Sequence, residues 1–521
     1  MRILAWAAVL SPAADFDILI RNARVIDGTG NPWYRADVAV KSGRIAAIGA
    51  LGGRSADRVI DARDRVVTPG FIDVHTHIEG AVEKVPRGDN YLLDGVTTVV
   101  TGNCGGSALP LGEWFAKLDK AGLGLNVASL IGHNTVRRQV MGTANRAATA
   151  EEIAKMQALV EEAMRQGAVG FSTGLIYIPG TYSNSDEVAA LARPAGKLGG
   201  VYASHMRDEG AKVLEAIAEA VRAGREAGAR VQLSHFKIDN KRLWGTSTRS
   251  LALVERYRNE GVDVVIDQYP YDRSSTDLGI TLPSWALADG AAAIRERLTS
   301  KVTRARIARE MLARLRSLGH LNYSYATVAG FAPNRAYEGK TITQINALKK
   351  RPRTVNAEIQ TIFDLMLAGG AQMVYHSMGT ADVDRIMRYP NTAIASDGGI
   401  REIGVGMPHP RSYGTNARVL AEYVRVRKVL TLEDAIRRMT SLPARTFAFR
   451  DRGLVREGFA ADILIFDPAR VKDVSTFQDP HRFSEGFDWV LVNGVAMVAD
   501  GKLTDARAGR VLRYRQGGEG K

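Results

Sequence analysis

Residues 66–77 read VVTPGFIDVHTH, an apolar run that ends in two histidines separated by one residue. Alternate residues of a β-strand face the same side of the sheet, so His75 and His77 can point together into an interior. Two imidazoles held on one rigid element can bind a single metal ion, usually Zn²⁺. An isolated H-x-H is more often a pair of surface histidines, but its place at the end of a buried strand favours a metal site.

Runs of the same kind recur between residues 67 and 445 and alternate with helical patterns. In residues 149–166, Thr149 and Glu152 have capping-box spacing and apolar residues recur at helical intervals. Apolar strands separated by helices predict a parallel sheet with both faces covered. Their number predicts a (β/α)₈ TIM-like barrel over residues 67–445. The runs include VTTVVTGNC, LNVASLIGH, AVGFSTG, GVYASH, RVQLSH, AQMVYHSM and NTAIASD.

Three further regions depart from this alternation. Residues 15–66 and 446–521, at the two ends of the chain, show period-2 alternation bounded by Gly, Asn and Pro, which predicts one small β-sandwich domain. Residues 284–355 interrupt the barrel pattern with Arg-rich helical sequence and carry 14 Lys+Arg against 4 Asp+Glu. An insertion of this length over the C-terminal face of a barrel would form a lid or a side wall of an active site.

The composition limits the class of protein. The 521 residues carry a net charge of +14, are 45% hydrophobic and include one cysteine, which excludes a disordered, collagen-like or disulfide-stapled protein. No apolar run is long enough to span a bilayer. Residues 1–14 resemble a short secretory signal, with a leader of another kind as the alternative, so a cytoplasmic and an exported protein both fit. The basic insertion carries no nucleic-acid-binding motif, so we expect it to attract a small anionic substrate and expect no nucleic acid partner.

Polar residues end several of the predicted strands. Cys104 follows VTTVVTGN, His205 ends GVYASH, His235 ends RVQLSH and Asp397 ends NTAIASD. Each alone is more often structural: a buried thiol, a hydrogen-bonded histidine or an aspartate in a turn. Together with His75 they occupy the C-terminal ends of predicted parallel strands, where barrel enzymes carry their catalytic residues. Thiolate and imidazole are Zn²⁺ ligands, and a nearby carboxylate can accept a proton from water.

From about residue 15 onward the chain resembles the amidohydrolase superfamily and, within it, the N-acyl-D-amino-acid deacylase (D-aminoacylase) family. The resemblance implies one tight Zn²⁺ held by Cys104, His205 and His235. It also implies a second, weaker site at His75 and His77, with Cys104 available to bridge. The stretches that carry the resemblance are VIDGTGNPWYRADV, TPGFIDVHTH, TGNCGGS, GLIYIPGTYSNSDE, SHMRDEG, LSHFK, DQYPYDRSSTDLG, ASDGG and HPRSYGTNARVL.

The same resemblance implies roles for residues around the metal. Asp397 matches the family's catalytic acid/base, and Arg411, in HPR, is suited to bidentate pairing with a substrate α-carboxylate. His376, in VYHSM, is a further candidate hydrogen-bond donor, with a structural role as the alternative. The charged residues 207–209 follow His205 and are expected to brace the metal ligands. The other implied substrate contacts are Tyr177, Lys237, Tyr269 and Ser275, with Ser274 as the alternative to the last.

These residues predict a zinc-dependent hydrolase that cleaves the amide bond of N-acyl-D-amino acids to a carboxylate and a free D-amino acid. The preference for the D form rests on the resemblance alone. Two alternatives within the superfamily are the opening of a cyclic amide, such as a hydantoin or dihydroorotate, and the hydrolysis of N-acyl-L-amino acids. An alternative of another class is an inactive scaffold protein. A monomer and a homo-oligomer are both compatible with the sequence.

Overall fold

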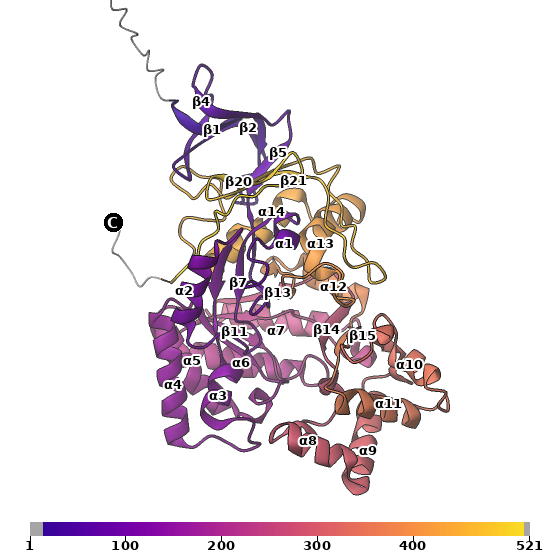
Figure 1. The fold of residues 1–521 in the computed structure, drawn as a ribbon. Helices are drawn as coiled ribbons and strands as arrows, with labels where there is room; N and C mark the ends of the chain where they lie inside the picture. Colours follow the sequence, from indigo (N-terminus) through magenta and orange to yellow (C-terminus); the bar gives the residue numbers. More distant parts are fainter. Residues whose placement is uncertain (1–13, 515–521) are drawn as a thin grey trace, which may run out of the picture.

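A computed structural model describes residues 14–514 of the chain (Figure 1). The predicted leader, residues 1–14, lies outside the described residues except for Ala14. The described chain forms a barrel, a sheet domain and a largely helical insertion, found at the middle, top and lower right of Figure 1. Among these residues, no helix combines the length and the apolar character needed to cross a bilayer.

Eight parallel strands of the described chain form the barrel. They are β6 (Phe71–Asp73), β7 (Val96–Thr101), β8 (Asn126–Ser129) with its continuation β9 (Ile131–Gly132), β10 (Gly170–Gly174), β11 (Val201–His205), β12 (Arg230–Leu233), β13 (Val264–Gln268) and β17 (Thr392–Ile394). The ring closes where the last strand meets the first, because the Asp397 N–H donates to the His75 carbonyl (2.8 Å) and the His77 N–H to the Gly398 carbonyl (2.7 Å). The predicted barrel is confirmed.

Helices alternate with these strands and cover the outside of the barrel. In the helix at residues 150–165, Met156 and Val160 are buried in the same apolar cluster as Phe171 of β10, and the predicted capping box between Thr149 and Glu152 is present. The barrel helices are α1 (Asp89–Leu92), α2 (Leu111–Ala121), α3 (His133–Met141), α4 (Ala150–Arg165), α5 (Ser185–Lys197), α6 (Val213–Ala227), α7 (Ser247–Asn259), α12 (Thr380–Arg388), α13 (Arg411–Arg418), α14 (Leu432–Met439) and α15 (Ser441–Thr446).

The sheet domain is built from both ends of the chain, as predicted. Its strands are β1 (Phe16–Val25), β2 (Tyr34–Lys41), β3 (Arg44–Gly49), β4 (Ala56–Asp61), β5 (Val66–Pro69), β18 (Ile463–Phe466), β19 (Phe487–Val492), β20 (Val495–Ala499) and β21 (Lys502–Leu503). Antiparallel pairing of β5 with β18 joins the two ends. Because β5 leads directly into β6, this domain anchors the strand that precedes the two histidines of the H-x-H motif.

The predicted insertion, residues 284–355, is the middle of a longer inserted unit, residues 273–376, which has a sheet and an apolar core of its own. Its strands β14 (Arg273–Asp277), β15 (Ala326–Gly330) and β16 (Gln372–His376) pair antiparallel and pack with α8 (Gly290–Thr299), α9 (Lys301–Ser317), α10 (Ile342–Leu348) and α11 (Val355–Leu367). The run AQMVYHSM therefore forms β16 here, and its prediction as a barrel strand is wrong. Met373, Val374 and Tyr375 are buried in β16, as the residues of a barrel strand would be. The composition of this run therefore does not distinguish a barrel strand from a strand of the insertion.

Candidate active site

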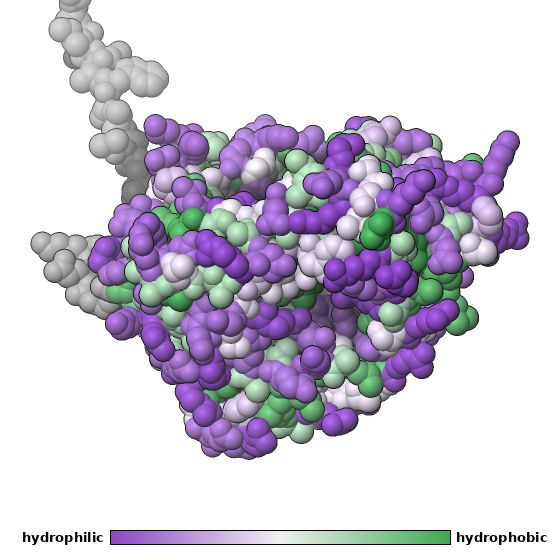
Figure 2. All heavy atoms as spheres, turned by 90° about the horizontal axis from the view of Figure 1, so that it is seen from below, coloured by the Kyte–Doolittle hydropathy of each residue, from purple (hydrophilic) through white to green (hydrophobic). Residues whose placement is uncertain are grey.

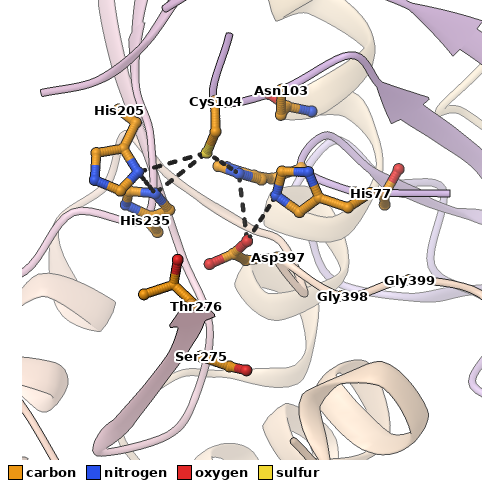
Figure 3. Close-up of polar contacts among 12 residues, drawn as sticks. His77, Asn103, Cys104, His205, His235, Ser275, Thr276, Asp397, Gly398 and Gly399 are labelled. Atoms are coloured by element: carbon orange, nitrogen blue, oxygen red, sulfur yellow. Dashed lines mark hydrogen bonds and ion pairs between the residues drawn. The ribbon is translucent and has the colours of Figure 1, made fainter. Parts of the chain in front are cut away.

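Six predicted residues converge at the C-terminal end of the barrel strands (Figure 3). They follow or end β6, β7, β11, β12 and β17. Because all barrel strands run in one direction, the residues that end them collect at one rim. The six are His75, His77, Cys104, His205, His235 and Asp397.

Three of these residues have a left-handed backbone, which side chains other than glycine rarely adopt. The φ angles are 52° at Cys104, 34° at His235 and 51° at Asp397. Such conformations cost roughly 1–3 kcal/mol each and persist where the surroundings hold them. Here the Asp397 N–H is bound by the His75 carbonyl (2.8 Å), and the His235 N–H by the Asp267 carboxylate (2.8 Å). The sharp turns point three side chains inward immediately after their strands.

The Cys104 sulfur lies at the centre of a histidine cluster. Cys104 Sγ is 3.5 Å from His205 Nδ1 and 3.6 Å from His235 Nε2, and these two nitrogens are 2.8 Å apart. Tetrahedral zinc with one sulfur and nitrogen ligands requires an S···N separation of about 3.6 Å. Burial raises the pKa of the Cys104 thiol, but the charge of His75 and hydrogen bonds from the histidines outweigh it and hold this pKa well below its usual value. A thiolate with two imidazoles is a donor set that fits zinc.

A second group of ligand atoms adjoins the first. His77 Nε2 is 3.0 Å and His75 Nε2 is 3.5 Å from Asp397 Oδ1. His75 Nε2 is also 3.3 Å from Cys104 Sγ, so the sulfur contacts both groups. The His75 side chain is fully buried, whereas that of His77 is 40% exposed, which leaves the second group more open to solvent than the first.

Comparison of the whole chain with known protein families agrees with this geometry, in which a thiol, histidines and an aspartate meet at the strand ends. The model of the "Amidohydrolase family" matches residues 58–498. The chain belongs to the amidohydrolase family. Two relatives from Alcaligenes xylosoxydans xylosoxydans are similar over 96% of this amidohydrolase: a D-aminoacylase, 34% identical over 98% of its own length, and an N-acyl-D-aspartate deacylase, 35% identical over 95%.

Solved structures of deacylases are also similar to this chain over nearly its whole length. A crystal structure of D-aminoacylase and one of N-acyl-D-glutamate deacylase from Bordetella bronchiseptica each have a TM-score of 0.82 and 34% identity, and cover 96% of this chain and 100% of their own. The second is described as complexed with zinc and with a phosphonate inhibitor that mimics the tetrahedral intermediate. A D-hydantoinase from Thermus sp. has a TM-score of 0.56 at 16% identity over 96% of this chain and 99% of its own, which shows a shared fold.

Two buried carboxylates contact the far sides of the clustered histidines. Glu209 Oε1 accepts hydrogen bonds from His235 Nδ1 (2.9 Å) and Lys237 Nζ (2.6 Å). Asp267, at the end of β13, is fully buried; its carboxylate lies 3.3 Å from His75 Nδ1 and accepts the His235 N–H. Of the charged residues at 207–209, Glu209 is thus the one that reaches the histidines. Asp267 was not predicted, although its strand-end position is the signal that identified the histidines.

Two of the predicted substrate contacts, Arg411 and Tyr177, lie beside residues of the cluster. Arg411 pairs with Asp397 Oδ2 at 2.8 Å, and the Tyr177 ring lies 4.9 Å from that of His205. In Figure 3 the Thr276 side chain points toward the cluster. Its hydroxyl donates to the Tyr177 hydroxyl at 3.1 Å.

Ser275, the neighbour of Thr276, takes the opposite orientation. Its hydroxyl donates to the Met373 carbonyl at 2.8 Å, and in Figure 3 its side chain points away from the cluster. Ser275 reaches Arg411 through its backbone, because its carbonyl accepts from Arg411 Nη2 at 3.2 Å. Ser274, the alternative, is bonded to Ser377 at 2.9 Å. On β14 the Ser275 side chain therefore faces away from the cluster, whereas the Thr276 side chain points toward it.

The remaining predicted contacts divide into two that lie near the cluster and one that does not. Lys237 is buried against Glu209, and Tyr269 is buried with the Arg411 guanidinium 4.7 Å from its ring centre. His376, in contrast, ends the antiparallel strand β16 and faces Asp272 at 3.4 Å, with its side chain 45% exposed. The structure does not bring His376 to the metal-ligand cluster.

A cavity of about 590 Å³ opens beside this cluster and includes Cys104 and Tyr177 in its lining. Ile280, Leu282 and Leu287, from the start of the insertion, form an apolar part of its wall. The surface seen from below is hollowed near its middle, where hydrophobic and hydrophilic side chains meet (Figure 2). A volume of this size is within the range of small-molecule sites.

Proposed function

We propose that this amidohydrolase is a zinc-dependent deacylase of N-acyl-D-amino acids. The observation that carries the proposal is the convergence of Cys104 Sγ, His205 Nδ1 and His235 Nε2 within 3.6 Å of one another, with Asp397 beside them. Relatives that match nearly the whole chain carry the names of N-acyl-D-amino-acid deacylases. The same convergence argues against an inactive scaffold, because a scaffold needs no carboxylate placed beside a thiol and two histidines.

The clustered side chains form two sets of candidate metal ligands. Cys104, His205 and His235 would hold one zinc ion tightly, because both histidines are buried and Glu209 fixes the orientation of His235. His75 and His77 would hold a second ion more weakly, because His77 is partly exposed. When bound, zinc supplies a Lewis acid that polarises the amide carbonyl and activates water.

Asp397 is the residue we assign to proton transfer. Its Oδ1 atom faces His77 and His75, and its Oδ2 atom is held by Arg411, so the carboxylate is fixed at the junction of the two groups. From there it would accept the proton of the attacking water and deliver it to the amide nitrogen as the amino acid leaves. The rigid left-handed turn at Asp397 keeps this carboxylate in place during both transfers.

Arg411 is the residue we assign to the substrate α-carboxylate. Its planar guanidinium offers two parallel N–H groups, and it lies over the Tyr269 ring, which limits its rotation. Tyr269, whose ring lies under the Arg411 guanidinium, and Lys237, which is buried against Glu209, would contribute to the same anion site. Tyr177, tied to Thr276, would donate to the substrate from the other side of the cluster.

We further propose that the basic insertion at residues 284–355 forms a wall of the substrate cavity. Leu287 of the insertion and Arg314 of α9 both line the cavity that contains Cys104. The excess of positive charge in this segment would attract an anionic N-acyl amino acid, with an effect that weakens as salt is added.

A chiral substrate panel, with zinc quantified in the same preparation, tests the proposed function. N-acetyl-D-amino acids should be hydrolysed, and N-acetyl-L-amino acids, hydantoin and dihydroorotate should not. A preparation with about one zinc per chain that hydrolyses the L or cyclic amides in preference would contradict the proposal. So would a zinc-loaded protein that turns over no amide.

A further inference from the structure

A second cavity, of about 330 Å³, lies at the junction of the barrel and the insertion. It shares no lining residue with the cavity of the candidate active site. Lys241 and Trp244, which follow β12, form one wall, and Arg273 of β14 and His376 of β16 form another. Its volume falls within the range of cavities that bind small molecules.

The charged groups that line this second cavity are cationic. Lys241 and Arg273 contribute ammonium and guanidinium groups, and His320 and His376 contribute imidazoles. Asp272 lies outside the lining, where it faces His376 at 3.4 Å and Arg273 at 3.8 Å and so offsets part of this charge. The pKa of His320 reflects these positive charges. Burial lowers this pKa, and the charges of Lys241 and His376 lower it further, to about 4. The cavity thus presents positive charge that no lining acid balances.

Polar groups in this cavity are available to a ligand. Arg273 Nε is buried and makes no hydrogen bond within residues 14–514, although it lies 3.8 Å from Asp272 Oδ1 and its guanidinium lies over the Phe477 ring. The hydroxyl groups of Ser324, Tyr325 and Thr327 add further donors to the lining. Buried donors without partners are costly, so a bound acceptor would relieve an existing penalty.

Flat rings on two sides of the cavity restrict the shape of the ligand. The His320 and Tyr325 rings stack, with centres 3.8 Å apart and planes 6° apart. The Trp244 and His376 rings, which also line the cavity, are 5.5 Å apart. Aromatic faces of this kind favour a planar molecule by offset stacking.

We propose that this cavity is a binding site for a small planar organic anion of the aromatic carboxylate class, separate from the catalytic centre. The carboxylate would bind Lys241 and Arg273, and the ring would lie against Trp244 and Tyr325. The proposal does not depend on the amide hydrolysis proposed above, because no residue of the two metal-ligand groups lines this cavity.

Titration of the zinc-loaded, full-length protein with benzoate, followed by tryptophan fluorescence, tests this site, because Trp244 is in its wall. Benzoate should change the emission saturably in the wild-type protein, and the change should be lost in Trp244→Phe. Lys241→Ala should weaken benzoate at least about tenfold, the effect of one charge-assisted hydrogen bond. Lys301→Ala, which removes an exposed lysine from the start of α9, is the matched control and should bind as the wild type does.

Two further probes examine the ligand class. Acetate, which keeps the carboxylate and lacks the ring, and inorganic phosphate should each bind at least about tenfold more weakly than benzoate. Wild-type affinity in Lys241→Ala, or an unchanged signal in Trp244→Phe, would overturn the site. Equal binding of acetate or phosphate would overturn the proposed ligand class. Lys241 is exposed, so its replacement leaves the core intact.

Discussion

His235 and His376 both end apolar strands, yet they occupy different surroundings. His235 follows β12, which lies between β11 and β13 with all three parallel, and its Nε2 atom is 2.8 Å from His205 Nδ1. His376 ends β16, which lies antiparallel between β14 and β15, and it pairs with Asp272. Parallel strands bring their C-terminal residues to one rim, whereas antiparallel neighbours send theirs to opposite edges. A strand-end residue therefore indicates a site only where neighbouring strands share a direction.

The largest effect is expected at Asp397, on the shared rim. Asp397→Asn keeps the shape of the side chain but removes the proton acceptor, so kcat should fall about 10³-fold. Zinc content should stay near that of the wild type, because the tight ligand set is untouched. Steady-state kinetics and metal analysis of one preparation measure both. A kcat close to the wild-type value would remove Asp397 from the mechanism.

A smaller effect is expected at Asp267, which lies behind the rim. Asp267→Asn weakens the support of His75 and of the His235 backbone, and zinc affinity should fall about 10–100-fold. Competition with a chelator measures the affinity. Asp462→Asn is the matched control, because Asp462 is also a buried carboxylate but pairs with Arg452 in the sheet-domain region. Equal losses of zinc affinity in the two variants would show that Asp267 acts only through general stability.

Neighbouring residues of β14 allow a finer comparison. Thr276→Val removes the hydrogen bond to the Tyr177 hydroxyl, worth about 0.5–1.5 kcal/mol, so kcat/KM should fall several-fold. Ser275→Ala should have less effect, since its hydroxyl binds the Met373 carbonyl away from the cluster. Kinetics of the two variants under one set of conditions decide the order. The reverse order would mean that strand alternation does not set which residue faces the substrate.

The smallest effect on hydrolysis is expected at His376. His376→Ala should change kcat/KM by less than about twofold, because such surface positions rarely affect a distant site. The same variant should weaken benzoate binding at the second cavity, which His376 lines. A large loss of hydrolysis would place His376 in the catalytic site after all.

The barrel and the clustered residues can be predicted from the sequence, because in a parallel barrel the residue that ends each strand lies at the same rim. Each of Cys104, His205 and His235 could be located from the end of its apolar run. In the antiparallel insertion, chain position does not determine spatial position in this way. The sequence therefore predicts AQMVYHSM as a barrel strand, and it predicts Ser275 or Ser274, and not Thr276, as a substrate contact. The sequence does not identify Asp267, because an aspartate that supports a histidine looks the same as a structural aspartate until its distance to His75 (3.3 Å) is known.

X-ray absorption at the zinc edge tests the central claim most directly, since it reports which atoms bind the metal. The wild-type protein should show one sulfur at about 2.3 Å together with nitrogen ligands at about 2.0–2.1 Å. In Cys104→Ala the sulfur signal should vanish, along with most of the turnover. Zinc bound by nitrogen and oxygen alone in the active wild-type protein would contradict a metal centre built on Cys104.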